Sequence, residues 1–288
     1  MEIGLNPCQA MFLNGILFNS EVWHSGTVTE IRLLETVDEY LLRYLVNAHS
    51  KTPLEFLYLE AGVIPIRFVI MSRRILYLQT LLQRDDDEIT KKIYQTQKKN
   101  PLSGDFAELV EKDRNSLGVH LTEAYIESKS KESLKVEIKA LIQQKALQYL
   151  SNKQQSHSKI KDIKYSKIQP QEYMISPIFT NEEVSFLFSL RSRMIKVSAN
   201  FPSSASNNLC PLCNKVKDDQ QHLLNCQILR EKYTSKYTSR HFSKYEDIFS
   251  ENIYKQKEIT NLCMKLFKLR ENIIESTPSI PVRMLEDN

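Results

Sequence analysis

The chain has 288 residues, of which 41% are hydrophobic and 26% charged, and its formal net charge is +4. These values are ordinary for a folded soluble protein, and six glycines and ten prolines are too few turn residues for a β-sandwich or a barrel. The mild basic excess permits nucleic-acid binding without requiring it.

The cysteines and the hydropathy pattern indicate in which cellular compartment the protein is expected. No run of eighteen apolar residues occurs, so the sequence predicts no membrane span. Cys8 and Cys263 stand apart, and the other three cysteines lie close to one histidine. A disulfide framework uses an even set spread along the chain, so we expect a reducing, intracellular environment.

Helical periodicity dominates residues 1–150 and predicts an all-α region. A capping box at residues 27–30 begins a helix that should run to residue 48. Its expected core face carries Leu34, Val37, Leu41, Tyr44 and Leu45. Further helices are expected at residues 66–83, 85–97, 105–115 and 131–150.

The helix expected at residues 66–83 is apolar on most sides, so it should lie at the centre of the core. It nevertheless carries Arg67 and Arg74. A buried guanidinium needs a carboxylate, and Glu55 and Glu60 are the nearest candidates. The alternative is a groove that presents both arginines to a nucleic-acid backbone.

Composition changes at residues 151–179, which we interpret as a basic linker. Residues 151–169 contain a single acid, Asp162, and helical periodicity is almost absent. A short strand at residues 160–165 is a further expectation. Five lysines lie in this stretch: Lys153, Lys159, Lys161, Lys164 and Lys167.

In the remaining chain, the sequence predicts a small module at residues 180–235 and a C-terminal helix and tail at residues 236–288. A second capping box, at residues 180–183, begins a helix that should reach residue 194. The final helix is expected at residues 254–275.

Three cysteines and a histidine lie within seventeen positions of the module. Cys210 and Cys213 flank a tight turn, and His222 and Cys226 are four residues apart on a helix capped by the acids at 218–219. Four such ligands close a tetrahedral shell, which is typical of one structural Zn²⁺ ion. The alternative is a set of buried cysteines with an incidental histidine.

Basic and aromatic residues surround these ligands. Cations at helical spacing can neutralise phosphates and aromatic rings can stack on bases, so the set predicts RNA or DNA binding. The alternative is an ordinary solvated lysine face. The candidate contacts are Arg191, Arg193, Lys196, Lys215, Lys217, Arg230, Lys232, Tyr233 and Lys236.

We expect no catalytic site in this chain. The acidic run at residues 85–88 fits a solvated helix N-terminus better than a metal-ion active site, because consecutive acids on a helix point in different directions. The sequence has no glycine-rich phosphate loop, nucleophile elbow or Cys/His nucleophilic pair.

Three stretches resemble the C-terminal part of non-LTR (LINE-type) retrotransposon reverse transcriptases. The first is Ile16-Leu-Phe-Asn-Ser-Glu-Val-Trp23, and the second is a set of segments between residues 34 and 77 that includes Glu60-Ala-Gly-Val-Ile-Pro65. The third is the Cys-Cys-His-Cys pattern itself. The likeness covers most of residues 10–230.

This resemblance implies a helical thumb and connection followed by a zinc knuckle, whose ligands correspond to the four named above. The catalytic Asp-Asp strand motif of the RNA-directed DNA polymerase is absent here and would lie in a palm upstream. We therefore expect a fragment without catalysis that grips template RNA or target DNA, in the nucleus if the element is functional. The alternatives are a zinc-dependent protein-interaction module and a decayed element copy without a role.

Overall fold

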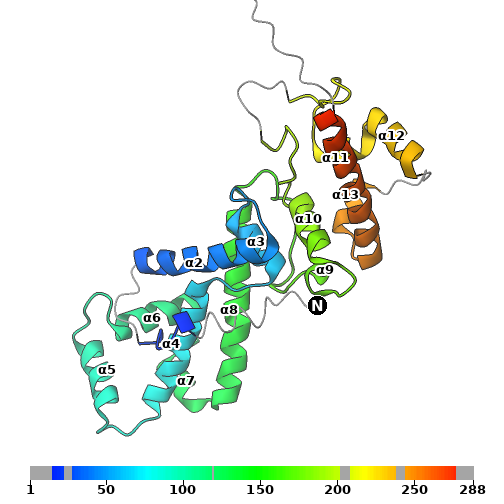
Figure 1. The fold of residues 1–288 in the computed structure, drawn as a ribbon. Coiled ribbons are helices and arrows are strands. Elements are labelled where there is room, and N and C mark those ends of the chain that lie inside the picture. Colours follow the sequence, from blue (N-terminus) through cyan, green and yellow to red (C-terminus); the bar gives the residue numbers. More distant parts are fainter. Residues whose placement is uncertain (1–14, 23–27, 119, 202–207, 238–243, 277–288) are drawn as a thin grey trace, which may run out of the picture. The chain divides into compact units, whose positions relative to one another are not determined.

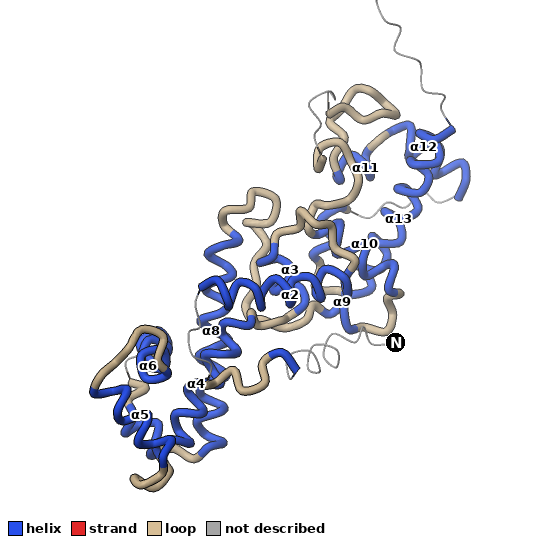
Figure 2. The backbone as a smooth tube through the Cα atoms, turned by 60° about the vertical axis from the view of Figure 1, so that its left-hand side comes forward, coloured by secondary structure: helices blue, strands red, loops and turns tan. Residues whose placement is uncertain are grey.

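The computed structural model describes residues 15–22, 28–118, 120–201, 208–237 and 244–276. In these ranges the regular structure is helical and no strand is formed, which confirms the all-α class (Figures 1 and 2). None of the helices in the same ranges is long and apolar enough to cross a membrane. Thr27, the expected first cap, lies outside the described residues.

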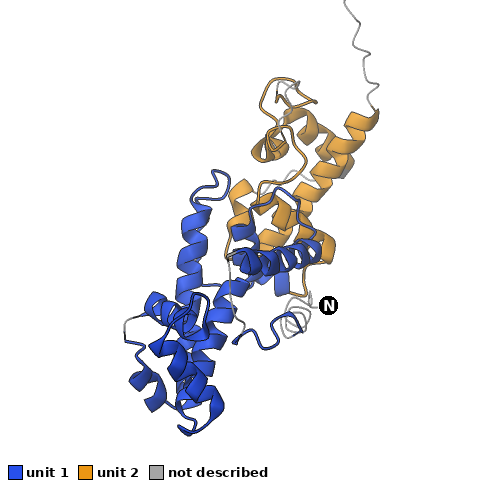
Figure 3. Cartoon of the chain, turned by 90° about the vertical axis from the view of Figure 1, so that its left-hand side faces the viewer, with its two compact units in different colours: residues 1–175 blue, residues 176–288 orange. Residues whose placement is uncertain are grey.

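The chain divides into two compact units, residues 1–175 and 176–288 (Figure 3). The boundary falls within the expected linker, close to its end. Residues 151–175 belong to the first unit, so most of the stretch interpreted as a linker is part of a folded body.

The first unit is built around α4 (Ile66–Leu82), which contacts α2, α5, α6, α7 and α8. Its buried residues lie on most sides of the helix, as its composition predicted. The other helices are α2 (Val28–Val46), α3 (Leu54–Ala61), α5 (Ile89–Lys99), α6 (Phe106–Leu117), α7 (Glu123–Ser128), α8 (Lys131–Gln154) and α9 (Glu172–Ile175).

The core face expected for α2 is wrong at two of its five residues, while Leu34, Leu41 and Leu45 are half-buried. Val37 and Tyr44, both assigned to its core face, are 45% and 74% exposed, whereas Leu42 and Val46 are buried. Asp38 is also buried on this side. Because α2 carries apolar residues around most of its surface, packing against α3 and α4 decides which of them face inward.

Two of the three arginines of α4, Arg67 and Arg74, are paired with carboxylates from other helices. Arg67 donates two hydrogen bonds to the carboxylate of Glu35 on α2, at 2.5 and 2.6 Å. The Arg74 Nε lies 3.0 Å from the Asp113 carboxylate on α6, and both side chains are almost fully buried. The partners expected on α3 are therefore wrong, and both guanidinium groups are neutralised inside the first unit.

The two glutamates of α3 instead hold the segment that follows α8. Glu60 accepts hydrogen bonds from the Tyr165 and Tyr173 hydroxyls, at 2.5 and 2.6 Å. The Glu55 carboxylate lies 3.3 Å from the His157 imidazole. Long-range side-chain contacts thus fix residues 155–173 against α3.

No strand forms at residues 160–165, in contrast to the expectation. Helix α8 continues to Gln154, and the chain then folds into turns. The buried Gln154 amide donates to the carbonyls of Ile160 and Ile163, at 2.5 and 2.7 Å. These hydrogen bonds give the two carbonyls partners, so the segment does not need a neighbouring strand to satisfy them.

The second unit is built around α13 (Ile253–Ser276), which contacts all the other described helices of this unit. The capping box of α10 is confirmed: the Thr180 hydroxyl accepts from the Glu183 N–H, and the Glu183 carboxylate accepts from the Thr180 N–H. The helix ends at Arg191, three residues earlier than expected. The remaining helices are α10 (Asn181–Arg191), α11 (Gln220–Asn225), α12 (Gln227–Tyr237) and the 3-10 helix η1 (Tyr245–Phe249).

Candidate metal centre

Cys210 and Cys213 lie on a tight turn closed by backbone hydrogen bonds. The Cys210 N–H donates to the Val216 carbonyl at 2.8 Å, and the Asn214 N–H donates to the Cys210 carbonyl at 2.8 Å. Asn214 has a φ of +50°, a left-handed conformation that asparagine tolerates better than most residues. The turn therefore brings the two thiols to the same side of the chain.

His222 and Cys226 are positioned by α11. The Asp219 carboxylate accepts from the His222 N–H at 2.8 Å and caps the helix, which confirms one of the two acids expected as the cap. Cys226 directly follows the helix, and its N–H donates to the His222 carbonyl at 2.7 Å. The imidazole and the thiol are thus one turn apart.

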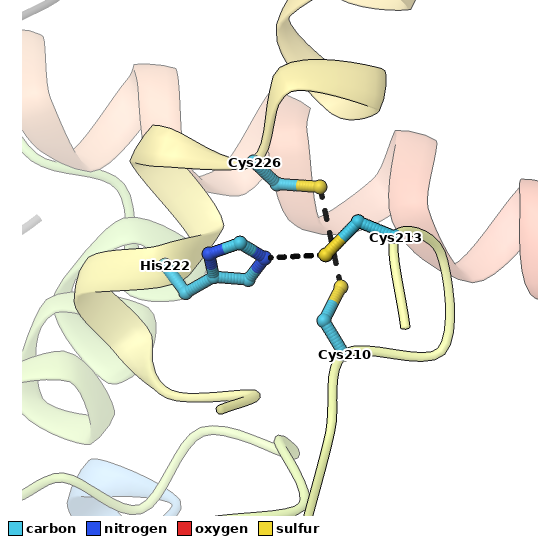
Figure 4. Close-up of side chains that lie close together, drawn as sticks. All are labelled: Cys210, Cys213, His222 and Cys226. Atoms are coloured by element: carbon cyan, nitrogen blue, oxygen red, sulfur yellow. Dashed lines mark hydrogen bonds between the residues drawn. The ribbon is translucent and has the colours of Figure 1, made fainter. Parts of the chain in front are cut away.

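The four side chains converge, as Figure 4 shows. Their ligand atoms all lie within 4.8 Å of one another. The Cys210 and Cys226 sulfurs are 4.0 Å apart, and the Cys213 sulfur lies 3.3 Å from the His222 Nε2. A tetrahedral shell with bonds of about 2.3 Å has ligand–ligand edges of about 3.8 Å. The cluster is therefore of the right size to hold a metal ion.

The protonation of the thiols differs across the cluster. Burial raises the pKa of Cys210 to about 11. Burial acts in the same direction on Cys213, but hydrogen bonds from the backbone N–H groups of Lys215 and Val216 outweigh it and lower its pKa to about 6. The turn thus stabilises one thiolate, the form in which cysteine binds metals.

Apolar residues pack next to the ligands. Leu223 and Leu224 of α11 and Leu229 of α12 are buried. They lie between and beside the ligand positions in sequence, on helices that contact each other and α13.

Asp218 has a structural role that the sequence did not indicate. It was expected to share the capping of α11 with Asp219, but it is buried, and its carboxylate accepts from the Ser198 N–H at 2.8 Å and the Ser198 hydroxyl at 3.0 Å. The same oxygen accepts from Arg270 of α13 at 2.7 Å. A buried aspartate thus ties the segment between the Cys210–Cys213 turn and α11 to two distant segments.

Two of the nine candidate nucleic-acid contacts are buried. Arg191 is 4% exposed, donates to the Ile248 carbonyl at 2.8 Å and covers the Phe249 ring. Tyr233 is 5% exposed. Both were wrongly expected at the surface. They stabilise the second unit, so neither side chain is presented to a ligand.

The other seven candidates are exposed cations of the second unit. Arg193 and Lys196 follow α10, Lys215 and Lys217 lie on the metal-binding turn, and α12 carries the rest. The α12 residues are Arg230, Lys232 and Lys236.

Among the residues that the structure describes, this is the one cluster of His, Cys, Asp and Glu side chains arranged to hold a metal ion. The acidic run at residues 85–88 forms no such cluster. Within it, Asp86 pairs with Lys91 at 2.9 Å and Glu88 with Arg84 at 3.1 Å.

The chain matches no family model, no curated protein and no solved structure. Its function must therefore be inferred from the site and its surroundings.

Proposed function

We propose that this chain is the nucleic-acid-binding C-terminal part of a non-LTR retrotransposon reverse transcriptase, which grips template RNA or target DNA. The observation that carries the proposal is the convergence of three thiols and one imidazole in a unit that also exposes seven cations. The family itself is inferred from the sequence resemblance described above.

The ion proposed for the cluster is a single Zn²⁺. Three thiolates and an imidazole are soft and borderline ligands, which suit zinc better than calcium or magnesium. When bound, the ion would cross-link the turn at Cys210 and Cys213 to the helix at His222 and Cys226. Because four protein ligands fill the shell, the ion would have a structural role.

The exposed cations would bind phosphates. Lys215 and Lys217 lie on the turn that carries two of the ligands, so the metal would fix their backbone positions. Arg230 lies in the first turn of α12, and its N–H donates to the Cys226 carbonyl at 2.9 Å. Binding through such contacts depends on salt, because each neutralised phosphate releases a counterion.

In this proposal the chain supplies binding, and RNA-directed DNA synthesis belongs to a palm on the longer parent protein. A working element of this kind would act on nuclear DNA.

A binding experiment tests the proposal. Anisotropy of a labelled RNA and a matched DNA duplex would be measured with zinc-loaded and chelator-treated protein over a salt series. We expect affinity that falls with salt and with zinc removal. The Cys213→Ser variant should behave like the chelated protein, and Cys263→Ala, which changes a buried thiol outside the cluster, should not. Equal affinity with and without metal would contradict the proposal.

A zinc-dependent protein-interaction module is the second candidate. It is favoured by two exposed apolar side chains close to the ligands, Val216 on the turn and Ile228 on α12. Replacing Arg230, Lys232 and Lys236 by serine separates the candidates. RNA binding should fall under the first proposal, whereas a protein partner would stay bound under the second. A decayed copy would give neither transcript nor protein.

A further inference from the structure

The net charge of the chain is concentrated in one short stretch. The chain has 39 Lys and Arg against 35 Asp and Glu, an excess of four. Residues 151–169 contain five lysines and one acid, which is also an excess of four, so the remaining chain is balanced in formal charge. This stretch lies in the first unit, away in sequence from the metal cluster, and the function proposed above does not use it.

The stretch comprises the end of α8 and a folded loop, residues 155–169, that is fixed at several points. Ile160 and Ile168 are buried, and Gln154 holds two carbonyls of the loop from inside. At the end of the loop, the Gln171 N–H donates to the Glu60 carbonyl at 2.9 Å. The loop backbone is thus held in place before any ligand arrives.

The packing at the end of the loop leaves no space for a side chain. Gly62 ends α3 with a φ of +67°, and a Cβ at this position would lie 1.9 Å from the Pro170 nitrogen. Only glycine allows this close approach. The contact fixes the chain immediately after the last lysine-bearing segment.

Exposed lysines lie on this fixed loop and at the end of the helix before it. Lys153 on the last turn of α8 and Lys161, Lys164 and Lys167 on the loop are exposed, and Asp162 is the only acid in the stretch. Among the residues that the structure describes, the ammonium groups of the last three lysines have no carboxylate partner. Ordered backbone with unneutralised cations at short intervals is complementary to a regularly charged polyanion.

We propose that this lysine loop, residues 155–167, is a second nucleic-acid contact that binds the phosphate backbone. The inference rests on the proposed function only for the kind of ligand, because the loop belongs to the other unit and needs no metal. Its apolar residues are buried or half-buried, so it offers no side chain for insertion into a bilayer. Its single aromatic residue, Tyr165, is bound to Glu60, so base stacking is not available. The contact is therefore to phosphates and independent of base sequence.

The test uses the zinc-loaded full chain and two variants of equal charge. The first changes Lys161, Lys164 and Lys167 to glutamine. The matched control changes Lys131, Lys135 and Lys139, exposed lysines on α8 of the same unit, to glutamine. Binding of a labelled DNA duplex would be followed over a salt series. For the loop variant, we expect the slope of log affinity against log salt to become shallower by about 2.7, at about 0.9 per phosphate contact.

The control should retain the slope of the unchanged protein. Equal slopes for the loop variant and the control would overturn the proposal. The single change Lys164→Gln, with an expected slope change of about 0.9, covers the case in which the triple variant does not fold. Phosphatidylserine–phosphatidylcholine vesicles provide a further arm. Vesicle binding that depends on the loop, with an unchanged nucleic-acid slope, would overturn the proposal in favour of a membrane surface.

Zinc removal separates this inference from the proposed function. One outcome is that chelation leaves the nucleic-acid affinity unchanged while the loop variant shows a shallower slope of log affinity against log salt. In that case the loop contact stands and the zinc-dependent function fails. If chelation lowers affinity while the loop variant behaves like its control, the zinc-dependent function stands and the loop contact fails. Absence of binding to every probe by the folded, zinc-loaded chain would overturn both.

Discussion

Arg270 on α13 forms an ion pair with Asp218, the residue that precedes the cap of the helix bearing His222. The Arg270 Nη2 and the Asp218 carboxylate oxygen are 2.7 Å apart, and the two side chains are 6% and 3% exposed. Without Arg270, the buried Asp218 carboxylate would be left as an uncompensated charge. The candidate metal centre therefore depends on a helix that supplies none of its four side chains.

Replacing Arg270 by methionine should weaken both the second unit and its metal affinity. The change leaves Asp218 buried without its counter-charge, which costs about 3–5 kcal/mol. Thermal unfolding and competition with a zinc chelator would measure the two effects. The control is Lys268→Met, two residues away, whose exposed ammonium lies 3.5 Å from Glu182. Chelator competition equal to that of the control would contradict the role assigned to Arg270.

A second buried pair, Arg74 and Asp113, should behave as a unit. Arg74→Met alone should destabilise the first unit by about 3–5 kcal/mol, because it strands the carboxylate between α4 and α6. The double change Arg74→Met with Asp113→Leu should recover most of this loss, since it removes both desolvation penalties. Denaturant unfolding of the unchanged protein, the two single variants and the double variant gives the coupling free energy between the two residues. If the unfolding free energies of the single changes simply add, the pair is not coupled.

The stability of the first unit should depend on pH through Asp38. Burial raises the pKa of this carboxyl from 3.8 to about 6, and the neighbouring Tyr58 hydroxyl opposes the shift only in part. Since the folded form holds the proton more tightly, the stabilising contribution is fully present below about pH 4 and is lost as the pH rises through about 6. The contribution is on the order of 2–3 kcal/mol.

Asp38→Asn removes this titration without changing the size of the side chain. The difference in unfolding free energy between the variant and the unchanged protein should therefore change between pH 4 and 6. As the pH rises, the variant should become more stable relative to the unchanged protein. A difference that is constant over this range would mean that Asp38 titrates normally.

Gln154 should be essential for the order of the lysine loop. Gln154→Leu fills a similar volume but leaves the Ile163 carbonyl without its side-chain donor and the Ile160 carbonyl with only the Ile163 N–H, at 3.1 Å. A buried acceptor without a partner costs about 1–3 kcal/mol, so we expect faster amide exchange at residues 156–168. The amides of α4 should keep their protection, and they serve as the internal control. Unchanged exchange in the loop would show that the amide does not hold it.

The metal cluster was predictable because its chemistry is local. All four ligands lie between residues 210 and 226, and the turn and the capped helix that position them are specified by residues within the same interval. The long helices were predictable for a similar reason, since periodicity and capping act over a few turns. Short helices such as α3 and α7 were missed, because six to eight residues carry too little periodic signal.

Side-chain exposure was less predictable, since it depends on segments distant in sequence. Arg191 is buried by residues that follow it by more than fifty positions, as its bond to Ile248 illustrates. The orientation of α2 is set by α3 and α4, and nothing in its own apolar pattern distinguishes Leu42 from Tyr44. The partners of Arg67 and Arg74 lie on α2 and α6, and only the tertiary arrangement identifies them.

The ion pair between Asp218 and Arg270 also has a consequence for biosynthesis. The chain is made from its N-terminus, so the four ligands leave the ribosome before the arginine that clamps their turn, which follows Asp218 by 52 residues. During that interval the aspartate has its serine partner but no counter-charge. A metal captured by the nascent chain would therefore be held less firmly than in the finished protein, and the last helix would complete the site.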